Sequence, residues 1–95
     1  MTQIKVRSMT SNKGNPIANQ FEIATPDGVY FQSYDSIIAF RPYNHVKYGV
    51  SIILDENTWD YSVTTGKYRN IFLGEGIAET RKSIADGDYK LADLN

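Results

Sequence analysis

The sequence predicts an α+β domain: a small antiparallel sheet of about four or five strands with two short C-terminal helices packed on one face. Apolar and polar residues alternate with the period of strands in the first half of the chain. The period becomes helical after residue 62. The chain has 95 residues, which suffice for one core but not for two. We expect one domain over 1–95, β-rich over 1–56 and helical over 62–87, with a docked tail over 88–95.

Strands are expected over residues 3–7, 20–25, 29–32, 37–40 and 50–54. The turn between the second and third is the sharpest local signal, because Pro26 has the φ of the first corner of a type I turn. Gly28 is expected to take the left-handed φ that closes this hairpin with a bulge.

Two short helices should follow. Thr64 or Thr65 can cap the first helix, and the second fits residues 77–86. The first helix should turn Tyr68, Ile71 and Phe72 toward the sheet. In so small a chain most large apolar residues must serve the core. The expected core is Phe21, Ile23, Phe31, Ile37, Phe40, Ile52, Leu54, Trp59, Phe72 and Leu73.

Composition excludes several classes of function. Ten Lys and Arg against eleven Asp and Glu give a net charge of −1, so bulk charge attracts neither nucleic acid nor an anionic membrane. No cysteine is present, and one histidine is too few for a His-rich metal site. Neither G-x-x-x-x-G-K-[ST] nor G-x-G-x-x-G occurs. We expect no cofactor, no metal and no catalytic residues. With no membrane span and no secretory signal we expect a cytoplasmic protein.

A loop joining two apolar strands is the first candidate site. It interleaves basic-type side chains with tyrosines, the residue types that most often anchor interfaces. Three interpretations stay open: an ordinary solvated hairpin loop, a protein-binding loop and a surface that stacks on single-stranded bases. The candidate partner-binding residues are Arg41, Tyr43, His45, Lys47 and Tyr48.

Two weaker candidates lie elsewhere. A nucleic-acid-binding module would use a basic face, formed by Lys5, Arg7 and Lys67 with Arg69, joined by Arg41 and Lys47 of the loop. A hydrolase would need the acidic cluster Asp55, Glu56 and Asp60 as paired acid and base. The alternative is that these three acids only shape the turn and the helix entry around Trp59.

Three segments of the chain resemble a family of short, uncharacterised proteins of tailed bacteriophages and prophages. The first comprises residues 19–23 followed by 27–39, the second residues 59–73 and the third residues 79–87. The most distinctive part, 61–73, has the pattern Tyr-Ser-Val-Thr-Thr-x-Lys-x-x-Asn-x-Phe-Leu. The chain departs from the family at Gly66 and Tyr68, where Ser and His are usual, and its connection over 42–48 is longer.

The resemblance implies a small intracellular phage protein, acting in the cytoplasm of its bacterial host, but it implies no particular activity, catalytic or binding. Small phage proteins often block a host or rival protein, restriction and CRISPR machinery included. We therefore expect a non-enzymatic accessory protein that binds a host or phage protein, as a host-takeover or anti-defence inhibitor. A nucleic-acid-binding module is the alternative, no membrane partner is expected, and exposed edge strands leave a homo-oligomer open.

Overall fold

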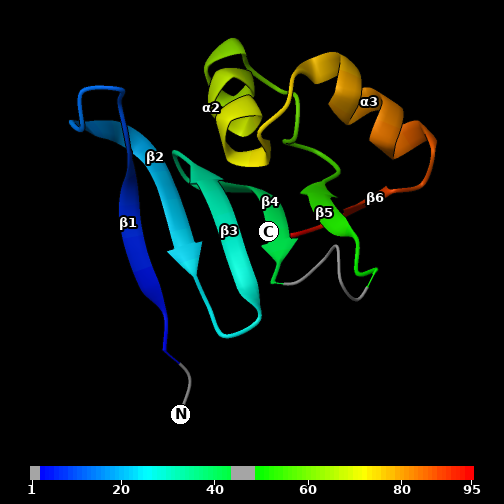
Figure 1. Cartoon of the computed structure of the whole chain (residues 1–95), viewed down its shortest axis with the longest axis horizontal. Coiled ribbons are helices and arrows are strands. Elements are labelled where there is room, and N and C mark those ends of the chain that lie inside the picture. Colours follow the sequence, from blue (N-terminus) through cyan, green and yellow to red (C-terminus); the bar gives the residue numbers. More distant parts are fainter. Residues whose placement is uncertain (1–2, 44–48) are drawn as a thin grey trace.

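A computed structural model describes residues 3–43 and 49–95. The strands form one sheet in the order β1-β2-β3-β4-β5-β6, so every strand pairs with its neighbour in sequence (Figure 1). The strands are β1 (Lys5–Thr10), β2 (Pro16–Ala24), β3 (Gly28–Ser33), β4 (Ser36–Pro42), β5 (Ile52–Asp55) and β6 (Tyr89–Ala92).

The predicted α+β class is confirmed, with one strand more than expected. Strands β1 to β5 are antiparallel, whereas β6 runs parallel to β5. A parallel pair needs a long crossover connection, and both helices lie in the connection between β5 and β6. The expected docked tail is therefore part of the sheet. Beyond β6, the Leu94 N–H donates to Asp55 and the Asn95 side chain bonds the backbone of Ile37.

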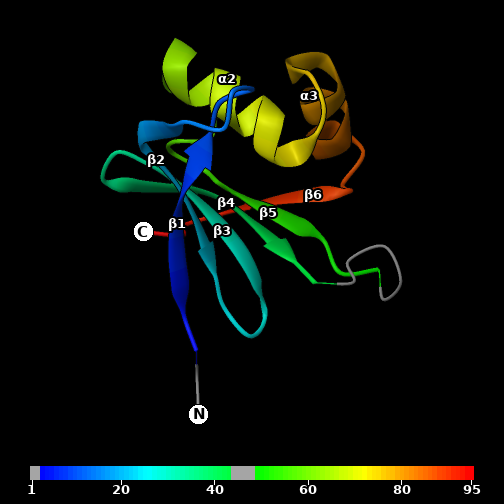
Figure 2. The ribbon, with the colours of Figure 1, turned by 60° about the vertical axis from the view of Figure 1, so that its left-hand side comes forward.

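The helices are α2 (Val63–Leu73) and α3 (Ile77–Ala85), and both lie above the same end of the twisted sheet (Figures 1 and 2). The cap of α2 is Ser62, whose hydroxyl accepts from the Thr65 N–H at 3.1 Å. The two expected caps, Thr64 and Thr65, both lie inside the helix. Thr65 is buried and shares a 3.0 Å hydrogen bond with Ser33 of β3. Gly74 ends α2 in the left-handed conformation, as a C-terminal glycine commonly does.

The turn before β3 forms where expected, but the reason for its glycine differs. Gly28 does not have a positive φ. A Cβ at this position would lie 2.5 Å from the carbonyl oxygen of Arg41 on β4. Glycine is therefore required by the close approach of β4 and not by the turn conformation.

One face of the sheet, called the front face here, carries the helices. The rings of Phe31 and Phe72 stack with centroids 5.6 Å apart, and the Ser33–Thr65 hydrogen bond lies on the same side. A bulge at Ile38 adds that residue to the core between β3 and β4. The buried apolar core consists of Met9, Val29, Phe31, Ile38, Ala39, Ile52, Leu54 and Phe72.

The opposite face, called the back face, holds four residues that were expected in the core. Phe21 and Ile23 of β2 lie opposite Gln32 and Tyr30 of β3, one position out of phase with Phe31. Ile37 and Phe40 of β4 follow the same phase, and all four are half-buried. The front face of β2 instead holds Gln20, which is buried. The expectation was wrong because alternation shows that a strand has two faces but not which face the helices cover.

Candidate functional site

Arg41, the first candidate of the β4–β5 loop, is occupied within the fold. Its Nη1 donates to the carbonyl oxygen of Phe72 at 2.6 Å. Its guanidinium lies 4.4 Å from the centroid of the Phe72 ring. A cation at the last turn of a helix bonds an unpaired carbonyl and complements the helix dipole. Arg41 therefore fastens α2 to β4.

Tyr43 is the one other predicted loop residue that the structure describes. Its side chain is about half exposed and borders a shallow hollow of about 380 Å³ near Lys5 and Pro26. His45, Lys47 and Tyr48 lie outside the described residues. Partner binding by the loop therefore stays a prediction, with Tyr43 exposed and the Arg41 guanidinium engaged by Phe72.

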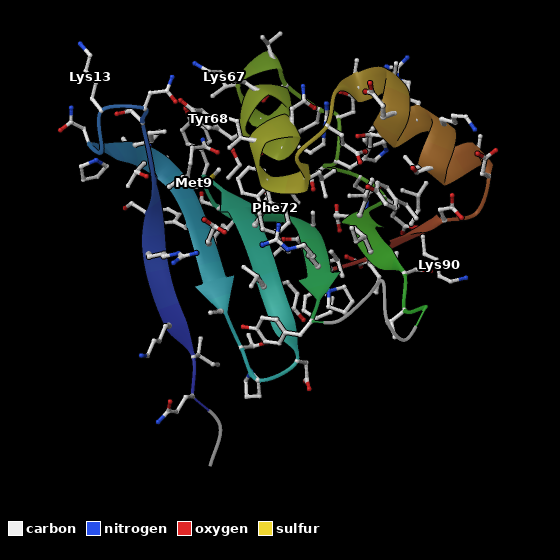
Figure 3. The ribbon with its side chains drawn as sticks, viewed as in Figure 1. Met9, Lys13, Lys67, Tyr68, Phe72 and Lys90 are labelled. Atoms are coloured by element: carbon white, nitrogen blue, oxygen red, sulfur yellow. The ribbon has the colours of Figure 1, made fainter. Side chains whose placement is uncertain are left out.

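The proposed basic face is divided between separate parts of the fold. Lys5 and Arg7 lie on the front face of edge strand β1, where Arg7 is 3.6 Å from Glu22. Lys67 lies on α2 and extends away from the helix, whereas Phe72 points toward the sheet (Figure 3). Arg69 is 2% exposed, so it adds no charge to the surface.

Arg69 is instead the centre of a buried polar network. Its Nη1 donates to the carbonyl oxygen of Trp59 at 2.8 Å and to Asp60 at 3.1 Å, and its Nη2 donates to Asn70 at 3.0 Å. The second oxygen of Asp60 accepts from Arg81 of α3 at 3.0 Å. Burial acts to raise the pKa of Asp60, but the hydrogen bonds and charges of the two arginines outweigh it and lower this pKa. The network joins α2 to α3.

The members of the acidic cluster Asp55, Glu56 and Asp60 also have separate surroundings. Asp55 is buried and accepts from the Asn57 N–H, the Thr58 hydroxyl and the Leu94 N–H. Burial opposes ionisation of Asp55, yet these hydrogen bonds lower its pKa. Within residues 3–43 and 49–95, no group of three acidic, His or Cys side chains is arranged to hold a metal ion. Asp55 and Asp60 thus have structural partners.

Helix α2 is unusual because two of its three buried residues are polar. Thr65, Arg69 and Phe72 are its buried residues. Val63 is 92% exposed and Ile71 is 57% exposed, although an inward Ile71 was expected. Lys67 lies between them at i+4 spacing, so the three side chains form one line along the helix. We call Val63, Lys67 and Ile71 the α2 ridge.

Two hollows flank the α2 ridge. One has a volume of about 530 Å³ and lies beside the start of the helix, with Tyr61, Asn70 and Ile77 in its lining. The other, about 220 Å³, lies between the ridge, Tyr68 and the β1–β2 turn. A ridge between two hollows offers a partner protein a surface on which it can pack with good shape complementarity.

The sequence contained a signal for this ridge. Val63, Lys67 and Ile71 follow one another at intervals of four residues, which places them on one helical face. Apolar residues in such a line are normally assigned to the core. The buried positions Thr65 and Arg69 are polar, so only the structure shows that the line faces outward.

The length of the helices and three comparisons with known proteins bear on what the chain is. Neither α2 nor α3 is long and apolar enough to cross a membrane. No curated protein and no solved structure matches the chain. A family model matches residues 4–88. This range includes strands β1 to β5 and both helices, and it ends before β6. The chain therefore belongs to this family, which is described as a family of unknown function (DUF8033).

Proposed function

We propose that this protein acts without catalysis, by binding another protein through the α2 ridge. The observation that carries the proposal is the inverted exposure of α2, which buries Thr65 and Arg69 and leaves Val63 and Ile71 outside. Exposed aliphatic side chains in a line cost solvation free energy until a partner covers them. An amphipathic helix that offers such a line is a recurring mode of protein recognition.

The charges around the ridge indicate the chemistry of the partner. Lys67 forms no ion pair within the described part of the chain, and α2 carries no Asp or Glu. Asp60, at the edge of the larger hollow, is already paired with Arg69 and Arg81. The complementary surface is therefore apolar with a carboxylate opposite Lys67.

The biological setting that we propose follows from the resemblance to phage proteins. In that setting the partner is a host or phage protein, and binding blocks it, as in host takeover or defence against CRISPR and restriction systems. The division of Lys5, Arg7 and Lys67 among separate surfaces favours a protein partner over nucleic acid, since a phosphate backbone requires a contiguous basic track.

The test is capture with matched variants. Tagged wild-type protein expressed in bacteria, with nuclease present, should retain one stoichiometric protein. Val63→Asp, which puts a carboxylate at the start of the ridge, should lose that protein because it repels an acidic partner and removes apolar contact. Tyr43→Ala, which alters the β4–β5 loop and leaves α2 intact, should retain it.

Binding measurements with the purified partner then give the loss of binding free energy for each variant. Val63→Asp and Ile71→Asp should each weaken binding by about 2 kcal/mol, the size of an interface hot spot. Equal binding by wild type and both ridge variants contradicts the site. Loss with Tyr43→Ala alone moves the site to the loop. Recovery of nucleic acid, with affinity falling steeply as salt rises, supports the basic module instead.

A further inference from the structure

The back face of the sheet carries a continuous apolar row that both helices leave uncovered. Residues that pair across neighbouring strands share a face, so the register connects one residue from each strand into a row. That row is Val6, Ile23, Tyr30, Phe40, Ile53 and Lys90. Five members are apolar or aromatic, and Lys90 comes last at the edge of the sheet (Figure 3).

A second row runs beside the first. It connects Ser8, Phe21, Gln32 and Ile37 on β1 to β4, and none of these is charged. Asp55 follows Ile53 on β5, but it is buried and its carboxylate accepts hydrogen bonds from within the chain. Between β1 and β5 the two rows thus present an uncharged surface with Phe and Tyr rings at its centre.

On β1 and β2 the front face is largely polar, whereas on β3 and β4 it holds the core residues Val29, Phe31 and Ala39. Lys5 and Arg7 of β1 and Glu22 of β2 lie there, as does Arg41 of β4. In a two-layer domain the apolar side of a sheet is normally the side that the helices cover. Strands β1 and β2 instead turn their apolar side away from α2 and α3, so folding of one chain leaves that side in contact with water. Val6 is 62% exposed in consequence.

We infer that two copies of the chain pack back face against back face, as a dimer of sheets. Because the two rows carry no charge between β1 and β5, the face offers an oppositely charged partner nothing to recognise. Its best complement is another uncharged apolar sheet, which a second copy supplies. Six strands about 4.8 Å apart with runs of about 17 Å give a face of roughly 500 Å². Two copies therefore bury about 1,000 Å², which reaches the lower limit of a biological interface and fits a dimer in reversible equilibrium.

In the proposed dimer the two-fold axis runs parallel to the strands. Homodimers have two-fold symmetry, so the same surface is used on both copies. An axis parallel to the strands places β1 of one copy over β6 of the other. Lys90 then faces the partner's edge strand and keeps its ammonium in water. The Tyr30–Phe40 pair, with ring centroids 4.4 Å apart, lies near the axis and supplies the central aromatic contact.

Sedimentation equilibrium of the full chain tests this assignment. The wild type should sediment with twice the mass of the chain, in a concentration-dependent equilibrium. Tyr30→Lys places a charge at the centre of the face and should give a monomer. Val6→Lys tests the same face at a highly exposed position on an edge strand, where substitution leaves the core intact, and should weaken the dimer at least tenfold. Val63→Lys, the same substitution on the α2 ridge, should leave the dimer unchanged.

Each other outcome overturns the assignment. A wild type that stays monomeric at every soluble concentration excludes the dimer. A dimer that survives both Tyr30→Lys and Val6→Lys uses another surface, and a dimer that Val63→Lys dissociates uses the α2 ridge. If Tyr30→Lys unfolds, Val6→Lys alone decides. Partner capture tests the α2 ridge, and sedimentation equilibrium tests the back face. A negative result in one experiment leaves the other proposal standing.

Discussion

Helices α2 and α3 occupy the same layer and follow one another in the chain. The surface that α3 presents to solvent is charged, whereas that of α2 is partly apolar. The outer side of α3 carries Glu79, Arg81 and Lys82, while Ile84 packs against the core. Lys82 is also paired with Asp86 at 2.9 Å. This is the arrangement expected of a surface helix whose outer side only has to be solvated.

In α2 the outer side is partly apolar and the buried side is partly polar. Its buried side includes Thr65 and Arg69, and its outer side carries Val63 and Ile71. Since α3 shows that this layer of the fold accepts a charged outer surface, the apolar ridge of α2 is not required by folding. The comparison therefore separates residues that hold the domain together from residues available to a partner.

The largest expected effect compares two arginines that share one carboxylate. Arg69 of α2 is 2% exposed and Arg81 of α3 is 65% exposed, and each bonds one oxygen of Asp60. Arg69→Ala should lower the free energy of unfolding by about 3 kcal/mol, because it leaves buried polar partners unsatisfied. Arg81→Ala should cost less than about 1 kcal/mol, as exposed ion pairs do. Urea denaturation of both variants measures the difference.

One outcome would break this part of the comparison. Equal losses for the two variants would mean that the inward cation of α2 is no more important than the outward cation of α3. A stable, well-packed Arg69→Met variant would be informative in another way, because apolar residues often replace buried ion pairs without loss. It would show that Arg69 can be exchanged so long as its space is filled.

The next effect compares how the two helices begin. At α2 the Ser62 hydroxyl accepts from the Thr65 N–H, whereas at α3 the Glu79 carboxylate accepts from the Gly76 N–H at 2.9 Å. Ser62→Ala should cost about 1 kcal/mol, the usual value for an N-cap. Glu79→Ala should cost about half as much, because the contact is exposed. Thermal unfolding of both variants decides, and a larger loss at Glu79 would contradict the assigned order.

Local sequence signals predicted much of this fold because most of its pairs are neighbours in sequence. Each of β1 to β5 lies beside the next strand along the chain, so turn residues and alternation were enough to predict hairpins. The sixth strand pairs in parallel with β5 after two intervening helices. Nothing local in residues 89–92 specifies that partner, so the sequence predicted only a docked tail.

The candidate site was less predictable because it depends on which side of each element faces inward. Arg69 was assigned to the surface, since a cation on a helix is normally solvated. The contact that buries it comes from Trp59 and Asp60, which a turn before the helix brings beside it. Once Arg69 is inside, Ile71 is outside, and the predicted inward face of α2 is wrong at that residue. Val63 and Lys67 then complete the exposed α2 ridge. The residue types alone do not predict that this line is exposed.

A smaller effect concerns pH and uses the same carboxylate between the helices. The pKa of Asp60 lies below its usual 3.8, so the ionised form is favoured by folding. Its stabilisation is complete above the pKa of the unfolded chain and is lost as pH falls through the lower folded pKa. Water screens part of this gain, because the Asp60 side chain is partly exposed.

Acid titration of stability measures that contribution. Asp60→Asn should lose stability at neutral pH and show a shallower fall between about pH 5 and pH 2 than the wild type. The pKa of Asp55 is also lowered, so the stability of the variant should still fall in part as the pH is lowered. A fall as steep as that of the wild type would show that the Arg69–Asp60–Arg81 network does not contribute to it.

The smallest expected effect on folding is the most informative about function. Val63→Ala on α2 should change the free energy of unfolding by less than about 0.5 kcal/mol, because its side chain is 92% exposed. Ile84→Ala on α3 should cost about 2 kcal/mol, because that side chain packs against the core. Urea denaturation gives both values, and partner capture gives the second readout. If Val63→Ala leaves stability unchanged but weakens capture, the α2 ridge is maintained for contact with another protein. If it destabilises the domain as much as Ile84→Ala does, Val63 belongs to the fold and the contrast between the two helices does not hold.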